Sequence, residues 1–453
     1  MIYDAALDDL LQKVWDGARI NPAEALRLYH LPLEELGALA DRRRCLAKQE
    51  AYAGRGNEIV TYIVDRNVNY TNVCNVYCKF CAFYRTEKDD DAYVITHEEM
   101  DRKIEETVAL GGTQILMQGG HHPKLTKQWY LDLLRHIKSK FPQVNIHGFS
   151  PSEFVHFREV FDEPLERIIG DFKEAGLGSI PGGGGEILVD RVRQRISPLK
   201  AMTDDWLSVM DVAHQLGLNS SATMMFGHVE TVEDRIEHLE RLRVQQDKSL
   251  DCGPDEARGE GDVPRATAPF QGGDSRGQLA RPHPGPLPQE RVDRPAPGVS
   301  SAAAAHAGLR GVGVEGSQGG LGSALKRSGE GGGTPAPYPP GFTAFIAWTF
   351  QAENTKLRAP TVGAHEYLRM QALSRIYLDN IPNIQSSWVT QGQDIGQVAL
   401  KYGANDLGSI MIEENVVSQA GTTFRMTVAD MKRLIQDLGY EPRQRDNWYR
   451  LVK

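Results

Sequence analysis

The sequence predicts an α/β protein, a (β/α)8-type (TIM-like) barrel. Strand-like and helix-like segments alternate along the chain, and eight strand–helix pairs can be counted. The length agrees: 453 residues exceed an ordinary domain, but the chain suits one barrel with short extensions once a Gly/Pro-rich stretch is set aside. A doubly wound open sheet is the alternative that the same alternation allows.

The eight strand-like segments are short, apolar and rich in β-branched or aromatic residues. In chain order they are EIVTYIVDR (58–66), TQILMQG (113–119), VNIHGF (144–149), LGSIPG (177–182), SSATMMFG (220–227), FTAFIAWTF (342–350), IQSSWV (384–389) and LGSIMI (407–412). In a barrel the loops that follow such strands carry the chemistry, and the opposite loops carry stability.

Helical segments with apolar positions three and four residues apart lie between these strands. Several of them open with Thr or Asp and close near Gly, as capping preferences favour. The clearest cover residues 97–112, 129–141, 203–217, 231–246, 364–378 and 427–439.

The Gly/Pro-rich stretch covers about residues 249–340 and holds 19 of the 45 glycines and 13 of the 24 prolines. It has neither helical nor strand periodicity and cannot bury enough apolar surface to offset chain entropy, which predicts a disordered insertion. Four regions follow: a helical N-terminal extension (1–55), the first part of the barrel (56–248), the insertion, and barrel completion with a C-terminal extension (341–453). The insertion follows a helix and precedes a strand, so we expect it away from the chemistry and dispensable for activity.

Composition excludes several classes of protein. The formal net charge of -9 leaves no basic field for a phosphate backbone, so nucleic acid is not expected as a main partner. No apolar run is long enough to span a membrane, and the acidic amphipathic N-terminus is unlike a signal peptide. We therefore expect a cytoplasmic protein that does not bind membranes.

Three of the five cysteines, Cys74, Cys78 and Cys81, form a C-x3-C-x2-C loop directly after the first strand. A structural zinc site needs four ligands, and no fourth cysteine is near. Three thiolates can hold three irons of a [4Fe-4S] cluster and leave the fourth iron open to an external ligand. The alternative is three buried structural cysteines. Cys45, in the N-terminal extension, and Cys252, in the insertion, are not expected to be ligands.

The three-cysteine spacing, with aromatic Phe80 before the last cysteine, resembles the radical S-adenosylmethionine (radical SAM) superfamily. The resemblance implies a radical SAM barrel in which the open iron binds the amino and carboxylate groups of S-adenosylmethionine. Reductive cleavage then gives a 5′-deoxyadenosyl radical that abstracts hydrogen from a substrate. It also implies a protein reductant such as flavodoxin or ferredoxin.

Motifs at the ends of successive strands resemble the cofactor-binding motifs of that superfamily. Gln118, Gly119 and Gly120 follow the second strand, where a plain strand-to-helix turn is the alternative. Ser150, Ser152 and Glu153 follow the third strand, where they suit ribose hydroxyls but also form an ordinary helix start. The remaining candidates are Glu186, which follows a run of four glycines and could bind a charged end of the cofactor, and Phe83, expected at the adenine.

Longer strings, among them LMQGGHHP, TMMFGHVETVEDRIEHL, AWTFQAENTKL and GANDLGSIMIEENVVSQAG, resemble the family of cyclic dehypoxanthine futalosine synthases of the futalosine route to menaquinone. The resemblance implies hydrogen abstraction from the ribose 4′ carbon of dehypoxanthine futalosine. The sugar radical then adds to the attached benzoate ring, and a spiro-cyclic product results. Related aminofutalosine synthases and deazaflavin-forming synthases share several of these strings and are alternatives.

Three residues that follow strands are the candidates for substrate contacts: His122, Glu230 and Asn354. A histidine of ordinary pKa suits proton transfer, although His122 before a proline also suits a helix cap. A non-catalytic iron–sulfur protein for electron transfer is the alternative of another class. It would need a fourth protein ligand and would leave the glycine motifs and Glu186 without a role.

Overall fold

A computed structural model describes residues 5–251 and 338–452 of the chain. The predicted insertion therefore lies almost wholly outside the described residues. The helix before it ends at Asp251 and the strand after it begins at Phe342. Within the two described ranges, no helix is long and apolar enough to cross a lipid bilayer.

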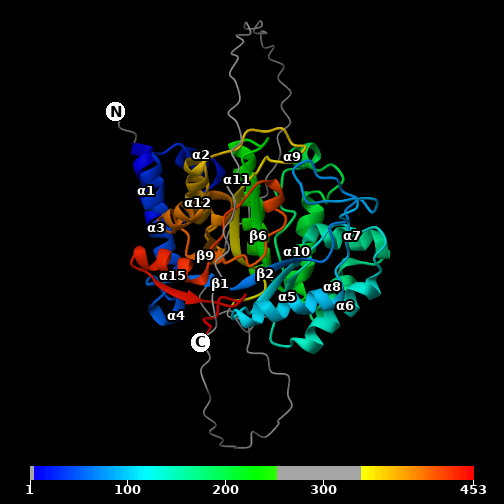
Figure 1. The fold of residues 1–453 in the computed structure, drawn as a ribbon. Helices are drawn as coiled ribbons and strands as arrows, with labels where there is room; N and C mark the ends of the chain where they lie inside the picture. Colours follow the sequence, from blue (N-terminus) through cyan, green and yellow to red (C-terminus); the bar gives the residue numbers. More distant parts are fainter. Residues whose placement is uncertain (1–4, 252–337, 453) are drawn as a thin grey trace, which may run out of the picture. The chain divides into compact units, whose positions relative to one another are not determined.

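A parallel ten-stranded sheet organises the described residues (Figure 1). Its strands are β1 (Ile59–Ile63), β2 (Asp65–Asn69), β3 (Gln114–Gln118), β4 (Asn145–Gly148), β5 (Ser179–Ile180), β6 (Asn219–Phe226), β7 (Phe342–Thr349), β8 (Asn383–Gln385), β9 (Asp406–Ser409) and β10 (Glu441–Gln444). The spatial order is β10-β1-β9-β8-β7-β6-β5-β4-β3-β2. All eight predicted strand segments are confirmed, the first as the pair β1 and β2.

The sheet closes on itself through one extended segment, residues 59–69. β1 and β2 are consecutive halves of this segment and only Val64 separates them. β9 pairs with the first half and β3 with the second half. Backbone bonds continue both pairings at the junction, because Thr113 N–H donates to the Val64 carbonyl and Ile412 N–H to that of Asp65. The strands thus surround a lumen as in a (β/α)8 barrel, and the open doubly wound alternative is excluded.

Helices cover the outside of this barrel, as the alternation predicts. They are α5 (His97–Ala109), α6 (Lys127–Lys140), α7 (Pro151–Phe161), α8 (Leu165–Glu174), α9 (Asp190–Ile196), α10 (Thr203–Gln215), α11 (Val232–Asp251), α12 (Ala364–Tyr377), α13 (Trp388–Gln391), α14 (Gln393–Val398) and α15 (Val428–Asp437), with 3-10 turns at Ala399–Lys401 and Ser418–Ala420. Thr96, Thr126 and Thr427 cap α5, α6 and α15 by accepting a backbone N–H.

The N-terminal extension is helical, as predicted, and comprises α1 (Ala5–Trp15), α2 (Pro22–Tyr29), α3 (Leu33–Lys48) and α4 (Ala51–Gly54). α3 packs against α12, and α2 packs against α11 (Figure 1). Lys48, at the end of α3, reaches the first residue of β8, where its Nζ donates to Asn383 Oδ1 at 2.8 Å. The extension therefore belongs to the wall and the floor of the barrel.

The C-terminal strand β10, which the sequence pattern did not predict, pairs in parallel with β1. After it the chain turns inward, and Arg445, Asn447 and Tyr449 line the cavity of the barrel. Because β10 pairs with β1 at the N-terminal half of the 59–69 segment, this turn closes the end of the barrel opposite the loops that follow the strands.

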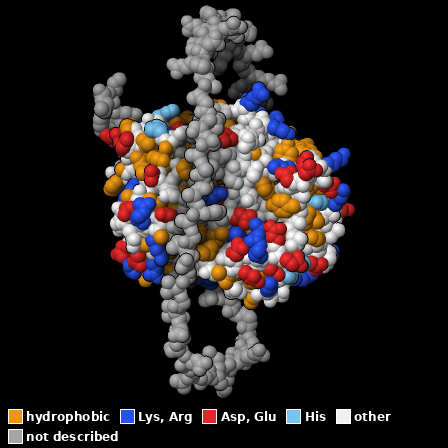
Figure 2. All heavy atoms as spheres, viewed as in Figure 1, with side chains coloured by type: hydrophobic (Ala, Val, Ile, Leu, Met, Phe, Trp, Pro, Cys, Tyr) orange, Lys and Arg blue, Asp and Glu red, His pale blue; other side chains and the backbone are white. Residues whose placement is uncertain are grey.

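On the face shown in Figure 2, acidic and basic side chains are interspersed and neither sign covers a continuous area. Ion pairs between exposed partners occur there and elsewhere, for example Arg433 with Asp437 at 3.2 Å. Such pairs contribute little to stability. The candidate active site is therefore the lumen of the barrel together with its mouth.

Candidate active site

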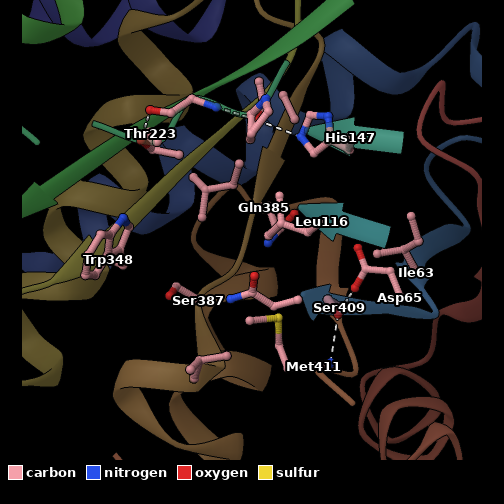
Figure 3. A pocket seen from close by; sticks show the side chains of 18 of the residues that line it. Ile63, Asp65, Leu116, His147, Thr223, Trp348, Gln385, Ser387, Ser409 and Met411 are labelled. Atoms are coloured by element: carbon pink, nitrogen blue, oxygen red, sulfur yellow. Dashed lines mark hydrogen bonds between the residues drawn. The ribbon is translucent and has the colours of Figure 1, made fainter. Parts of the chain in front are cut away.

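The lumen holds a cavity of about 280 Å³. Alternate residues of the strands line it, because successive side chains of a strand point to opposite faces of the sheet. They include Asp65 and Asn67 of β2, Gln114, Leu116 and Gln118 of β3, His147 of β4, Ser221 and Thr223 of β6, Ala344, Ile346 and Trp348 of β7, Gln385 of β8 and Ser409 of β9. Figure 3 shows most of these side chains gathered around one space.

The lining includes both apolar and polar side chains, which are interspersed around the space in Figure 3. Leu116, Ile346, Trp348 and Met411 offer apolar surface of the kind that packs against an aromatic ring. Amide, hydroxyl, imidazole and carboxylate groups make the polar part. The pocket therefore suits a molecule with both an aromatic and an oxygen-rich portion.

A buried ion pair forms the floor. Arg445 Nε lies 2.6 Å from Asp406 Oδ2, and Arg445 Nη2 donates to Asp406 Oδ1 at 2.9 Å. Thr61 Oγ1 donates to Asp406 Oδ2 at 2.5 Å. Burial alone would lower the pKa of the Arg445 guanidinium, but the carboxylate beside it raises that pKa above its ordinary value. The guanidinium is thus neutralised and does not offer a free cation to a ligand.

Asp65 stands above this pair and faces the lumen (Figure 3). Gln114 Nε2 donates to its Oδ2 at 2.7 Å, and Ser409 Oγ donates to its Oδ1. Burial raises the pKa of the Asp65 carboxyl. Each carboxylate oxygen keeps capacity for a further donor, such as a hydroxyl of a bound molecule.

The predicted cysteine loop follows β2 at the C-terminal end of the barrel. The three thiols are free, Cys78 is buried and the other two are half-buried. Burial raises the pKa of Cys74 and raises that of Cys78 to about 12. Nearby Lys200 acts in the opposite direction, since its charge lowers the pKa of both thiols. The segment thus holds three thiols, and a nearby cation favours the thiolate form of Cys74 and Cys78.

Within residues 5–251 and 338–452, no three His, Cys, Asp or Glu side chains come close enough together to hold a metal ion. The structure therefore does not itself show the three cysteines as ligands of one metal centre. The donor set nevertheless fits an iron–sulfur cluster: three unpaired thiols lie on one short loop, near enough to influence one another's ionisation. Backbone bonds hold both ends of the loop, from Cys74 N–H to the Arg85 carbonyl and from Lys79 N–H to the Ile196 carbonyl.

Glu186 lies beside this loop and lines the lumen. Lys200 Nζ donates to its Oε1 at 2.8 Å, whereas its Oε2 is buried without a hydrogen-bond partner. Lys200 also stands over the Phe80 ring at 5.3 Å. Glu186 adopts a positive φ of 30°, which is uncommon outside glycine and is found at ligand-binding positions. Arg193 Nη1 lies 3.6 Å from this Oε2, so the oxygen is paired with a charge but accepts no hydrogen bond, and it can still accept one from the ammonium or hydroxyl of a cofactor.

The glycine pair after β3 has a packing role. A Cβ on Gly119 would lie 2.5 Å from the Tyr70 ring, and one on Gly120 would lie 2.1 Å from the Val73 carbonyl. Both positions therefore require glycine so that β3 can approach the base of the cysteine loop. The close approach that the sequence predicted for a ligand is made in the structure to the protein itself. Gln118, just before the pair, lines the lumen.

The Ser150-Ser152-Glu153 motif separates into two roles. Glu153 accepts four hydrogen bonds, from the Tyr70 hydroxyl, Gly119 N–H, Ser150 N–H and Ser150 Oγ, at 2.6–3.1 Å. It is thus the capping residue of α7, and its acceptor positions are occupied by the protein. Ser152 Oγ is buried and has no partner. It lines a second, polar pocket with Lys200 and His121, beside the cysteine loop.

Aromatic packing anchors the base of that loop. The Tyr70 ring packs against that of Phe149 at a tilt of 60°, with centroids 5.6 Å apart, and the Phe149 and Phe172 centroids are 5.2 Å apart. Tyr130 packs against Tyr70 and Phe157 at 5.6 and 4.5 Å. Because these rings are fully buried, they fix the point at which β2 gives way to the cysteine segment.

The three candidates for substrate contacts are not brought together in the lumen. His122 Nδ1 accepts Lys124 N–H at 3.1 Å within a local turn, and it does not cap the next helix, α6, whose cap is Thr126. Glu230 is fully buried; it accepts Gly227 N–H at 2.6 Å and lies 2.8 Å from Arg235 Nε. Asn354, at φ 57°, is exposed and donates to the Gln419 carbonyl at 2.9 Å. None of the three lines the 280 Å³ cavity.

Phe83, the residue expected at the adenine, is half-buried on the segment after Cys81, and its carbonyl accepts Arg85 Nη1 at 3.2 Å. Of the predicted cofactor residues, Gln118 and Glu186 line the lumen and Ser152 lines the neighbouring pocket. The structure therefore places these three at the mouth of the barrel, close to the cysteine loop.

Several lumen residues were missed by the sequence analysis: Asp65, Asn67, His147, Gln385 and Arg445. The signal that could have found them is polar alternation. Polar residues at every second position of a predicted barrel strand, as in Asp65 and Asn67 or Gln114 and Gln118, point to one face. Lys200, the partner of Glu186, carries no such signal because it lies in an irregular loop.

Two family comparisons cover most of the described barrel. Residues 68–242 match the radical SAM superfamily, and residues 339–453 match the CofH/MqnC C-terminal region. The first match contains the cysteine loop, Glu186 and Lys200. The second match contains β7 to β10, and thus Trp348 and the Arg445–Asp406 pair at the floor of the barrel. The cofactors of the superfamily are an iron–sulfur cluster and S-adenosylmethionine.

Relatives similar over nearly the whole chain include two cyclic dehypoxanthine futalosine synthases. That of Halalkalibacterium halodurans is 35% identical and that of Streptomyces coelicolor 37%, each over 99% of this chain and over 95% and 90% of the relative. Aminodeoxyfutalosine synthase of Thermus thermophilus is 29% identical over 100% of this chain and 97% of its own.

Among solved structures, methylornithine synthase (PylB) matches with a TM-score of 0.58 at 14% identity, over 96% of this chain and 97% of that one. At this identity the likeness concerns the fold alone, and it agrees with the barrel described above. Family matches, full-length relatives, barrel and cysteine loop agree with one another. The chain belongs to the radical SAM superfamily and, within it, to the family of cyclic dehypoxanthine futalosine synthases.

Proposed function

We propose that this protein cyclises dehypoxanthine futalosine to its spiro-cyclic product in menaquinone biosynthesis, after hydrogen abstraction from the ribose 4′ carbon. One observation carries the proposal. The identity of 35% and 37% to enzymes of that name extends over 99% of the chain and so includes every strand that lines the lumen. The lumen is lined by both apolar and polar side chains, which suits a substrate made of a benzoate ring and a sugar.

Cys74, Cys78 and Cys81 would hold a [4Fe-4S] cluster, and its fourth iron would take S-adenosylmethionine. When bound, these groups supply the radical that removes a hydrogen atom from the substrate. Glu186 through Oε2, which accepts no hydrogen bond, Ser152 through its unpartnered Oγ, and Gln118 would contact S-adenosylmethionine, with Phe83 at the adenine. A cytoplasmic reductant such as flavodoxin or ferredoxin would deliver the electron.

The barrel contributes orientation and exclusion of water. The ring of strands closes at residues 59–69, and the buried Arg445–Asp406 pair lies at the floor, so among the described residues strands and this ion pair surround the cavity. A sugar radical formed in such a cavity meets the attached ring instead of water. Trp348 and Ile346 would pack against that ring and hold it near the sugar.

His122, Glu230 and Asn354 remain predicted substrate contacts. In the present structure their polar atoms bind the protein, and Glu230 in particular neutralises Arg235. Each would have to exchange a protein partner for a substrate atom, whereas Asp65 and Gln385 already face the lumen. We therefore regard Asp65 and Gln385 as better candidates for substrate contacts than these three residues.

The direct test is anaerobic reconstitution with iron and sulfide, followed by dithionite, S-adenosylmethionine and dehypoxanthine futalosine. Mass spectrometry should detect 5′-deoxyadenosine and a product that lacks two hydrogen atoms of the substrate. Cys78→Ala should abolish both and lower bound iron, while Cys45→Ala, a matched change on α3 outside the loop, should retain both.

A second candidate is an aminodeoxyfutalosine synthase activity, because a relative of that name aligns with 100% of the chain at 29% identity. Deoxyadenosine formation without the cyclic product would retain the radical SAM chemistry and reject the proposed substrate. An intact cluster that supports neither S-adenosylmethionine binding nor cleavage would favour an electron-transfer protein.

A further inference from the structure

His147, on β4, is a lumen residue that has no role in the function proposed above. Its side chain is buried, lines the cavity and points into it (Figure 3). Two serines flank the ring: Nδ1 lies 2.7 Å from Ser179 Oγ, and Nε2 lies 3.5 Å from Ser221 Oγ. These contacts are sufficient to assign the proton on the ring.

Ser179 Oγ already accepts a hydrogen bond, from Asn145 Nδ2 at 3.2 Å. A hydroxyl oxygen can accept two hydrogen bonds, so this contact alone does not set the direction. Ser179 is fully buried, however, and among the described residues His147 Nδ1 is the acceptor that the structure offers to its proton, so the arrangement that leaves no buried donor unsatisfied has Ser179 donating to Nδ1. A neutral imidazole that accepts at Nδ1 carries its proton on Nε2. The hydrogen-bond network thus selects one tautomer of the ring before any ligand enters.

The Nε2–H is not used up by the protein. Its separation of 3.5 Å from Ser221 Oγ is at the limit of a hydrogen bond. Ser221 Oγ already accepts Gly182 N–H at 3.1 Å. A donor on the wall of a cavity that has only a long contact to the protein is placed to bind an acceptor in that cavity.

The ring is also uncharged. Burial, reinforced by the Arg445 charge, lowers the pKa of His147 to about 3. The charged side chains that line the same cavity are Asp65, Glu186, Glu414 and Arg445, and each is bound to a protein partner. With three carboxylates against one neutralised guanidinium, the lumen disfavours a carboxylate and accepts a neutral, hydroxylated group.

We propose that His147 presents its Nε2–H to the lumen and binds a sugar hydroxyl oxygen of the substrate there, with the carboxylate of the benzoate ring turned toward the mouth. The inference rests on the proposed function for the identity of the substrate. The tautomer and its exposure to the lumen do not depend on it. Ser179 is the positioning residue that fixes the ring.

The first measurement needs neither cofactor nor substrate. In the full chain with ¹⁵N-labelled histidine, long-range proton–nitrogen spectra should show His147 with a proton on Nε2 and a bare, accepting Nδ1 from about pH 6 to pH 8. The signal is assigned by its loss in His147→Gln. A charged ring or a proton on Nδ1 in this range would overturn the assignment.

The second measurement separates binding from structure. His147→Phe should raise the KM for dehypoxanthine futalosine about tenfold, as expected for one lost hydrogen bond, and His147→Gln should recover part of the loss because an amide N–H replaces the ring N–H. His214→Gln is the matched control. His214 is also buried between two serine hydroxyls, at 2.6 and 2.7 Å, but outside the lumen, so its KM should stay unchanged.

Deoxy analogues of the substrate identify the contacted hydroxyl. For one analogue, wild type and His147→Phe should bind equally, since the oxygen that His147 contacts is missing. If wild type turns over the substrate and His147→Phe keeps the same KM, the inference is wrong. If wild type fails to turn over dehypoxanthine futalosine while the tautomer is as described, the proposed substrate is wrong and the ring assignment stands.

Discussion

Two residues of the Ser150–Glu153 segment, Ser152 and Glu153, have different roles in the structure. All four hydrogen bonds accepted by Glu153 come from the protein, whereas Ser152 Oγ, one residue earlier, is buried and has none. A buried hydroxyl without a partner is costly unless a ligand satisfies it. We therefore propose that the cofactor role predicted for this motif belongs to Ser152, whereas Glu153 completes the capping box of α7.

Two substitutions test this division. Glu153→Gln places an amide N–H₂ against groups that are themselves donors and should destabilise the fold by about 1–3 kcal/mol without changing S-adenosylmethionine affinity. Ser152→Ala should leave thermal stability unchanged or higher but weaken S-adenosylmethionine binding to the reconstituted protein. Thermal unfolding and equilibrium dialysis give the two readouts. Equal losses of affinity in both variants would contradict the assignment.

Lys48 is the second residue whose environment has a measurable consequence. Its ammonium is buried below β8, where it donates to Asn383 Oδ1 and stands 5.5 Å from the centre of the Tyr52 ring. Burial lowers the pKa of Lys48 to about 7, with the charges of Arg375, Arg44 and Arg445 adding to the effect and Asp406 opposing it. In the unfolded chain the same group keeps its ordinary pKa, near 10.5.

The unfolded state therefore binds more protons than the folded state between about pH 7 and pH 10, and the free energy of unfolding should rise with pH across this window. Relative to Lys48→Met, which removes the titration, the slope should approach about 1.4 kcal/mol per pH unit. Urea unfolding of both proteins at several pH values measures it. Parallel curves for the two proteins would show that Lys48 keeps an ordinary pKa when folded.

At the scale of elements, the closure of the barrel depends on β1, β9 and β10. β1 pairs with β9 on one side and β10 on the other, and Arg445, directly after β10, returns to Asp406 at the start of β9. Asp406 also accepts the Thr61 hydroxyl of β1. One carboxylate thus links three neighbouring strands at the floor.

Asp406→Asn should consequently destabilise the fold by about 3–5 kcal/mol, because it leaves the Arg445 guanidinium buried without a counter-charge. Asp437→Asn is the control: its partner Arg433 is exposed, and the change should cost no more than about 1 kcal/mol. Chemical denaturation distinguishes the two. Similar small effects would mean that water reaches the floor and solvates Arg445.

At the scale of the whole molecule, the sequence places an insertion between α11 and β7. The described chain leaves the barrel at Asp251 and returns at Tyr338, and this connection runs from a helix end to a strand start. Such connections lie at the end of the barrel opposite the catalytic loops. The residues that line the cavity and form the cysteine loop in the described part of the chain come from both sides of this segment.

Replacement of residues 253–336 by a short Gly/Ser linker should therefore retain kcat and KM within about twofold, and shortening the loop roughly tenfold should stabilise the barrel by about 2 kcal/mol through lower closure entropy. Turnover of dehypoxanthine futalosine and thermal unfolding of the two chains provide the comparison. Loss of turnover with an intact cluster would give the insertion a role in the reaction.

The sequence by itself determined the class of fold and the cofactor loop. Strand periodicity, helix caps and the three-cysteine spacing are local signals, since each is written in neighbouring residues, and the eight strand segments follow from them. The sequence did not predict β10, because its residues, EPRQ, lack the apolar pattern of a strand. In the structure β10 pairs with β1.

Only the tertiary structure decided which polar groups share a site. His122, Glu230 and Asn354 follow strands, as predicted, yet none lines the lumen. Local turns bind the polar atoms of His122 and Glu230, and Asn354 donates to the distant Gln419 carbonyl. His147 and Arg445 come from positions nearly 300 residues apart and meet in one cavity because the ring of strands closes at residues 59–69. Hydrogen-bond partners and burial depend on such long-range closure, so no local pattern can specify them.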